Sequence, residues 1–255
     1  MNSVNLGWPL AVLLLTLAGL AGIITRVAGL GPLHAPVVAA LRAVAQLAAI
    51  STIIVAVLHS LGWTLLFLCG MVLVAGATSG RRIRGAGPRR PGAWWAVAPI
   101  TAGVVPVMAL ILLSQVVPTE PVAILPTTGI LIGGAMTATT LGARRMGEEL
   151  TSHRGAYEAA LALGLTRRAS AVLIARQAAA LALIPGLDQT RTVGLVTLPG
   201  AFVGVLLAGA SPWQAAAAQL LVLISLLLVQ AIAVTLAIEL IGAGRLPATP
   251  TPLQQ

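Results

Sequence analysis

The sequence predicts an all-α integral membrane protein, a polytopic bundle of about seven transmembrane helices. Hydrophobic residues make up 58% of the 255 residues, and the mean hydropathy is +1.00. Charged residues make up 8%, whereas a soluble domain carries roughly 25%. Several apolar runs approach the roughly 20 residues that a helix needs to cross a bilayer. The segments of about ten alternating residues that build a transmembrane barrel are missing, so we expect helices that contact membrane lipid.

The apolar runs place the predicted spans along the chain. Residues 1–5 carry no positive charge ahead of the first run, so we expect a retained helix rather than a cleaved signal peptide. Segment 144–168 is polar and is expected in the cytoplasm, and segment 169–184 is expected to lie along the membrane interface. The predicted spans are 6–24, 36–58, 61–79, 94–113, 122–141, 192–209 and 215–241.

Arginines set the predicted orientation of this bundle. All fifteen basic residues are arginine, and in the loops they gather at Arg26, in 81–90, in 144–168 and at Arg245. The alternate loops carry no arginine, so the positive-inside rule places the amino terminus outside and the carboxyl terminus in the cytoplasm. If 169–184 crosses the membrane instead, the sequence predicts eight spans and an external carboxyl terminus.

The same composition excludes several classes of function. A chain without lysine cannot use a P-loop lysine to hydrolyse ATP. Cys69 is the single cysteine, so an internal disulfide is impossible. The histidines and the cysteine show no metal-ligand spacing, and a metal site stays unassigned. We interpret the net charge of +9 as a topology signal and expect no nucleic-acid partner.

A short helix is predicted within the polar segment, from Tyr157 to Leu163, with Gly164 as its terminator. Such a helix, held parallel to the membrane, can dock in a groove of a soluble partner. Glu158 would supply a charged contact, and Ala159 and Ala160 would allow close approach. The alternative is an ordinary amphipathic helix in a loop.

Two polar residues of the second predicted span are candidates for a translocation path. Arg42 and Gln46 are four residues apart and share one helix face. Such groups cost about 2.5–3.5 kcal/mol at the bilayer centre and usually face an interior or a cavity. The alternative for Arg42 is that it snorkels to the cytoplasmic interface. Gln46 is too short to snorkel, so interior hydrogen bonding is expected.

Met136, Asp188 and Thr192 are further candidates for the path or its gate. Asp188 has two structural alternatives, because it can cap the following helix or pair with Arg191 one turn on. A metal ion would need two or more convergent ligands, and the candidate ligands are scattered along the sequence.

Two proline–glycine pairs are predicted hinges. Pro185 and Gly186 break the apolar run before Asp188. Pro199 and Gly200 fall inside the predicted span 192–209, where proline would remove a backbone hydrogen bond and kink the helix.

The pattern around the short helix resembles the EAA loop of bacterial ABC importer permeases, the element that docks on the ATPase. Glu158, Ala159 and Ala160 are followed after three residues by Gly164, and Ile174 lies ten positions beyond the glycine. The leucine–proline pair expected next is absent, because Arg176 and Gln177 stand there.

Most of the chain resembles the UPF0014 family. The resemblance is carried by Arg42 to Leu47, Gly129 to Met136, Glu158 to Gly164, Ile184-Pro185 with Asp188, Thr192 to Gly200, and Ala208-Gly209. Characterised bacterial members are FetB-type iron-export permeases that pair with a separate ATPase, and plant relatives are linked to aluminium tolerance. Two departures are Gly134, where the family usually has asparagine, and Leu165 to Arg167, where it tends to have alanine and then a Thr-Pro pair.

The resemblance implies the membrane subunit of an ABC transporter in the bacterial inner membrane, exporting iron or a related metal. It would be a homodimer with two ATPase subunits, which would bind ATP and Mg, so this chain would bind no cofactor itself. A gradient-driven secondary transporter is the alternative, but only Asp188 and Glu239 are candidate intramembrane acids, and no internal repeat is visible. A membrane enzyme would need a paired nucleophile and base, and the sequence shows no such pair.

Overall fold

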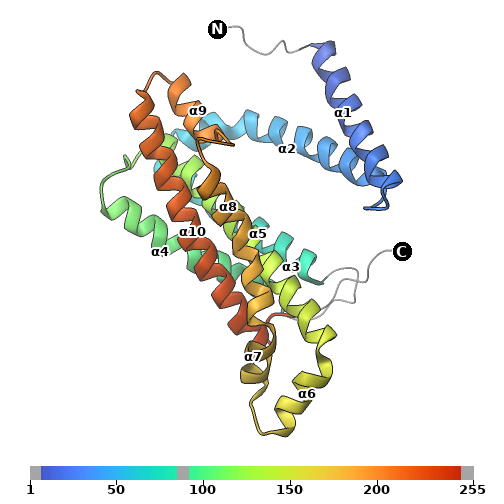
Figure 1. Ribbon diagram of the computed structural model, residues 1–255. Coiled ribbons are helices and arrows are strands. Elements are labelled where there is room, and N and C mark those ends of the chain that lie inside the picture. The colour runs from blue at the N-terminus through green and yellow to red at the C-terminus, as the bar shows by residue number, and fades with distance from the viewer. Residues whose placement is uncertain (1–6, 85–91, 248–255) are drawn as a thin grey trace. The chain divides into compact units, whose positions relative to one another are not determined.

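The computed structural model describes residues 7–84 and 92–247, and these are helical with short connections (Figure 1). They fall into two compact units, an amino-terminal hairpin and a larger bundle that begins at Ser60. The hairpin is α1 (Trp8–Val27) and α2 (His34–Leu58). The bundle consists of α3 (Leu61–Arg84), η1 (Ala93–Ala96), α4 (Val97–Leu113), α5 (Pro121–Ser152), α6 (Arg154–Ala162), α7 (Arg167–Ala180), η2 (Leu181–Leu183), α8 (Ile184–Thr192), α9 (Gly200–Leu207) and α10 (Pro212–Gly242).

Seven helical segments of the described chain are long and apolar enough to cross a membrane. This confirms the predicted all-α class and the number of long apolar helices. Six of the seven overlap predicted spans: α1, α2, α3, α4 with η1, α5 and α10. The remaining segment runs from Arg167 to Thr192 and joins α7, η2 and α8 into one path.

The sequence was wrong about the region between α6 and α10. The predicted single helix over 192–209 does not form, because the chain leaves helical conformation after Thr192 and α9 spans only 8 residues. The predicted separate helix over 169–184 instead continues through η2 into α8. Pro185 does not stop it, since it lies in the first turn of α8, where its missing N–H has no intrahelical partner in any case. The eight-span alternative is wrong for the same reason, because it requires residues 192–209 to form a spanning helix of their own.

Helix α5 is longer than the predicted span 122–141. It continues without interruption to Ser152 and has 32 residues, about 48 Å at the usual rise per residue. Near its end lie the ion pair Arg145–Glu148, at 3.4 Å, and a contact of 3.1 Å between Glu149 Oε1 and the Nδ1 of His153, the residue that follows α5. The polar segment therefore begins as an extension of a long apolar helix.

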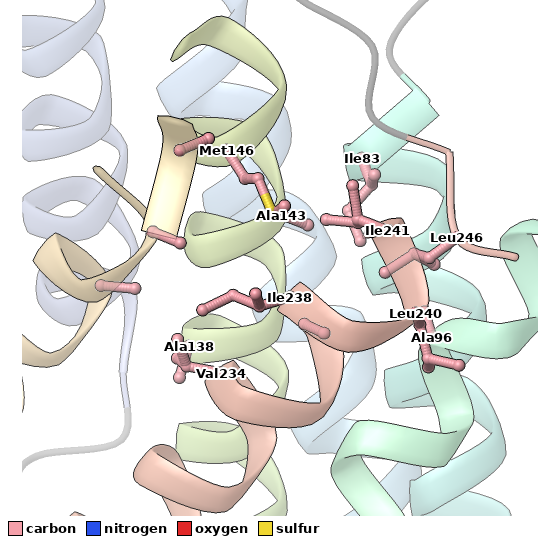
Figure 2. Packing of buried hydrophobic residues seen from close by; sticks show 14 of the residues in the cluster. Ile83, Ala96, Ala138, Ala143, Met146, Val234, Ile238, Leu240, Ile241 and Leu246 are labelled. Carbon is pink, nitrogen blue, oxygen red and sulfur yellow. The ribbon is translucent and has the colours of Figure 1, made fainter. Parts of the chain in front are cut away.

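A hydrophobic core cluster lies where the carboxyl-terminal parts of α3, α5 and α10 meet η1 and α7, and we call it the core cluster. Figure 2 shows Ala143 and Met146 of α5 near Ile238 and Ile241 of α10, with Ile83 of α3 alongside. Ile83, Ala143 and Met146 are fully buried. Arginines surround this cluster, namely Arg81, Arg82 and Arg84 in the last turn of α3, Arg144 and Arg145 beside Met146, Arg168 at the start of α7, and Arg245 after α10.

Farther along α10, Gln230 marks a second point of close packing. A Cβ atom added at Gly186 of α8 would collide with the Gln230 side-chain oxygen. A Cβ at Gly134 of α5 would collide with Leu226 and lie 3.4 Å from the Gln230 amide nitrogen. Gly134 therefore allows α10 to approach α5, and no room is left for the asparagine that the family resemblance suggested.

Candidate coupling site and transport path

The short helix α6 lies between the end of α5 and the start of α7, and contacts both helices. It begins at Arg154, three residues before the predicted start, and ends at Ala162. Gly164 follows with φ +89°. Its N–H donates to Leu161 O at 3.0 Å, and the next N–H, of Leu165, donates to Ala160 O at 3.2 Å. These two bonds form a Schellman cap, so the predicted terminating role of Gly164 is confirmed.

Helix α6 has an inner and an outer face. Ala160 is buried, and Tyr157 packs against the core cluster. Ala159 is exposed, and so is Glu158, whose side chain is 59% accessible. Leu163 is 82% exposed just beyond the helix end. The outer face thus offers a carboxylate, a small residue and a large apolar side chain to a soluble partner.

An ion pair within α6 orients Glu158. Arg154 Nε donates to Glu158 Oε1 at 2.8 Å, one turn away. The hydrogen bond and the negative charge of Glu158 raise the pKa of Arg154 above its usual value. Arg154 therefore stays charged across the physiological range.

A second ion pair joins the start of α7 to the end of α10. Arg168 Nε donates to Glu239 Oε2, and these residues are 71 positions apart in the sequence. A Cβ at Gly242 would lie 3.2 Å from Arg168 Cγ, so glycine lets this side chain lie against α10. A displacement of α6 and α7 would therefore act on α10 as well as on α5.

The predicted path residues lie in different places. Arg42 and Gln46 are exposed on α2, in the amino-terminal hairpin. Met136 is half-buried on α5, and Asp188 is exposed on α8. Thr192 is half-buried at the end of α8 and donates its hydroxyl to Asp188 O at 2.8 Å. Among the described residues no hydrogen bond or ion pair joins Met136 to Asp188.

Asp188 takes one of the two structural roles that the sequence left open. Its Oδ1 lies 3.5 Å from Arg191 Nη1, and both side chains are well exposed, at 59% and 71%. It does not cap the helix that follows, because Pro199 occupies the N-cap of α9. The Asp188–Arg191 contact is at the outer limit of a hydrogen bond, so both groups remain open to other partners.

The structure gives another explanation for the glycine and proline residues at the two predicted hinges. Gly186 is buried and lies against Gln230, which explains why a residue without a side chain stands there. Pro199 precedes α9 and Gly200 is its first residue, so Pro199 begins a helix rather than kinking one.

Between α8 and α9 the backbone bonds to itself. Thr192 O accepts from Leu195 N at 3.2 Å and from Val196 N at 2.9 Å, and Gly194 N donates to Thr197 O at 2.9 Å. A cavity of about 350 Å³ is lined by residues of this turn, α9 and α10. In α10, Gln219 Oε1 accepts from the backbone N–H of Phe202 at 3.2 Å, which anchors α9.

Sequence reasoning missed Gln219, Gln230 and the partner of Glu239. Gln219 and Gln230 are buried in α10, which has the highest mean hydropathy of the seven candidate spans in the described chain. Each is a polar residue in an apolar helix, which is the signal that singled out Gln46. The Arg168–Glu239 pair gives no such signal, because its members are 71 positions apart.

Comparison with known proteins finds relatives that are named as membrane or transport proteins. The chain is 40% identical over 164 residues to the UPF0014 membrane protein STAR2 of Oryza sativa subsp. japonica, covering 64% of this chain and 56% of that protein. It is 38% identical over 162 residues to protein ALUMINUM SENSITIVE 3 of Arabidopsis thaliana, covering 64% and 58%. It is 34% identical over 128 residues to the probable iron export permease protein FetB of Escherichia coli (strain K12), covering 50% and 49%.

The matches thus span little more than half the length of the two plant proteins. No solved structure matches the chain. The model of the uncharacterised protein family UPF0014 matches residues 8–244, which is nearly the whole chain. This multi-pass membrane protein therefore belongs to the UPF0014 family.

Proposed function

We propose that this chain is the membrane-spanning permease subunit of an ABC transporter, driven by a separate ATPase that docks on α6. The observation that carries the proposal is the outer face of α6. Glu158, Ala159 and Leu163 are exposed together, while the buried Ala160 and Tyr157 pack the helix against the bundle. The chain contains no lysine for a P-loop, so ATP and Mg would be bound by the partner.

The distribution of arginine supports a cytoplasmic position for α6. Basic residues lie in the last turn of α3 and in the carboxyl-terminal part of α5, begin α7 and follow α10, and all these segments meet at the core cluster beside α6. The positive-inside rule assigns this end to the cytoplasm. With seven crossings the amino terminus lies outside and the carboxyl terminus inside. This orientation equals the predicted one, although the sixth crossing is Arg167–Thr192 rather than 192–209.

Movement of the ATPase would reach the membrane by two routes. One route is α5, which runs unbroken from Pro121 to Ser152. The other is the Arg168–Glu239 pair between α7 and α10. Both routes reach the segment that carries Asp188, because α10 contacts α8 and α5 contacts η2, which leads into α8. Closure of the ATPase would tilt these helices together and alternate the side on which the path opens.

The substrate and setting of the proposed transporter follow from relatives. One of them is named a probable iron export permease, and another is named for sensitivity to aluminium. We propose iron or a related metal as the exported substrate and the bacterial inner membrane as the location. Two permease copies and two ATPase subunits would form the complex.

Charge reversal at Glu158 tests the docking. We expect Glu158→Arg to weaken binding of the copurified ATPase by about tenfold or more, because like charges placed across an interface cost several kcal/mol. Metal export from cells should fall in parallel. Glu148→Arg is the matched control, since Glu148 also pairs with one arginine, Arg145, but lies on α5. Binding is measured by titration of the purified permease, and export by metal retained in cells.

The proposal fails if no ATPase copurifies with the intact chain, or if Glu158→Arg and Glu148→Arg have equal effects. Export that persists without any ATPase and collapses with the ion gradient would favour a secondary transporter instead.

A further inference from the structure

Two surface cavities lie along the seam between α3 and the segment formed by η1 and α4, and both belong to the larger bundle. The first has a volume of about 540 Å³ and is lined mostly by apolar side chains of α3, α4 and α5, so we call it the apolar cavity. The second has a volume of about 320 Å³, and we call it the basic cavity. Its lining includes Ala77, Arg81 and Arg84 of α3 and Trp94 of η1.

The two cavities share one face of α3. Leu73 lines the apolar cavity, and Ala77 and Arg81 line the basic cavity. These three residues are four positions apart, so they lie one above another on the helix, and all three are exposed. We call them the α3 stripe. The middle side chain is only a methyl group, so it is a small obstacle to a molecule that lies along the stripe.

Close packing of α3 against η1 and α4 fixes the walls of both cavities. A Cβ atom added at Gly76 would collide with Val97, which lines the apolar cavity. A Cβ added at Gly80 would collide with the carbonyl oxygen of Ala93, which lines the basic cavity. The backbone of α3 therefore sets the positions of the two cavities relative to each other.

No acid in the described residues neutralises the arginines of the basic cavity. All six acids of the sequence are described, and five of them contact an arginine or histidine elsewhere. The sixth, Glu120, precedes α5. Near the basic cavity α5 meets α3 through Thr140, whose Oγ1 lies 2.9 Å from Ser79 Oγ, about 30 Å beyond Glu120 along the helix. Arg81 and Arg84 therefore present positive charge that an external anion can balance.

An aromatic pair places the basic cavity at the membrane surface. Trp94 is 66% exposed, and its ring stacks on Trp95 with 4.4 Å between the centroids. The guanidinium of Arg245 lies 5.1 Å from the centroid of the Trp95 ring. Tryptophan is enriched where lipid headgroups meet the hydrocarbon, and basic pockets between membrane helices bind anionic headgroups.

We infer that a phospholipid with an anionic headgroup occupies the two cavities. Its phosphate binds Arg81 and Arg84, and one acyl chain follows the α3 stripe into the apolar cavity. Leu73 is about 12 Å from Arg81 along α3. This is within the depth of one leaflet, which is about half of the ~30 Å hydrocarbon thickness.

The two cavities together favour an anionic lipid over simpler ligands. A soluble anion would bind the arginines but leave the apolar cavity unused. A neutral lipid would fill the apolar cavity and leave the arginines unbalanced. The inference goes beyond the proposed function, because it depends on α3 and α4 crossing the membrane and not on the docking of an ATPase.

Lipid titration of the purified full-length chain in detergent tests the inference, with bound lipids counted by native mass spectrometry. We expect the first dioleoylphosphatidylglycerol to bind at least tenfold more tightly than dioleoylphosphatidylcholine, whose phosphate is balanced by its own cation. Arg81→Gln should weaken binding of the anionic lipid by about tenfold, the scale of a lost hydrogen bond between charged groups. Arg82→Gln is the matched control, because Arg82 is exposed in the same turn but lines neither cavity.

A second variant tests the acyl chain without changing any charge. Ala77→Phe places a bulky ring on the α3 stripe and should weaken binding of dioleoylphosphatidylglycerol as much as Arg81→Gln does. Val74→Phe is its control, because Val74 is 66% exposed on α3 and lines neither cavity. We expect the control to bind this lipid like the wild type.

Three outcomes would overturn the inference. Displacement of the lipid by millimolar inorganic phosphate would mean a site for a soluble anion. Equal losses from Arg81→Gln and Arg82→Gln would mean attraction to the general positive charge. A lower thermal midpoint for Ala77→Phe with unchanged lipid binding would mean that protein covers the α3 stripe. The titration contains no ATPase, so failure of ATPase docking leaves its result unaffected.

Discussion

The substitution Gly186→Val is expected to lower the free energy of unfolding by about 1–3 kcal/mol, the usual cost of overpacking a core. The reason is steric, because even a Cβ atom at this position collides with the Gln230 side chain. Thermal unfolding in detergent would show the loss as a lower midpoint.

A rescue and a control separate this clash from other effects of a β-branched residue. Gln230→Ala removes the obstructing side chain, so the double variant should lose less stability than the sum of the two single variants. Gly133→Val is the control, because a Cβ at Gly133 meets nothing within 4 Å. Equal losses at positions 186 and 133 would show that packing against Gln230 is not the cause.

The second large effect is expected at the turn that ends α6. Gly164 has φ +89° and open space around its Cα, so Gly164→Ala tests backbone conformation alone. A left-handed alanine costs about 1–2 kcal/mol, which corresponds to a factor of roughly 5–30 in the local opening equilibrium. Hydrogen exchange of the α6 amides should quicken by that factor, and coupling to the ATPase should weaken.

Two further substitutions test the cause. Gly155 lies in the same helix and also has open space, but without a positive φ. Gly155→Ala should therefore slow exchange, since alanine is about 1 kcal/mol better than glycine in a helix. Gly164→Asn should fall between wild type and Gly164→Ala, because asparagine tolerates the left-handed region. The explanation fails if Gly155→Ala and Gly164→Ala change exchange in the same direction.

The sequence predicted α6 well because its signals are local. A glycine that follows a short polar helix can be recognised as its terminator from the neighbouring residues alone. The Schellman hydrogen bonds of Gly164 and Leu165 also involve only residues of the last turn of the helix. The long apolar helices were predictable for a related reason, since each carries a run of apolar residues long enough to span a bilayer.

The helix boundaries in residues 167–209 were not predictable, because they depend on contacts with helices that are distant in the sequence. The sequence placed residues 169–184 along the membrane interface, but Arg167–Thr192 together is long and apolar enough to cross a membrane. The run after Thr192 is as apolar as a span, and composition does not show that Pro199 starts a new helix there. The packing of α8 on α10 also depends on a contact, between Gly186 and Gln230, that joins distant parts of the sequence.

The turn between α8 and α9 gives the bundle halves of unequal stiffness. On one side of Gln230, α5, α7 and α10 are held by helical hydrogen bonds and the core cluster. On the other side the chain has already left the helix at Val193 and bonds locally to Thr192 O. Motion of α8 against α9 there rotates backbone torsions and breaks no ladder of helical bonds. The part of the bundle that holds the core cluster can therefore act as a rigid lever, while the part around the turn between α8 and α9 can deform at low cost.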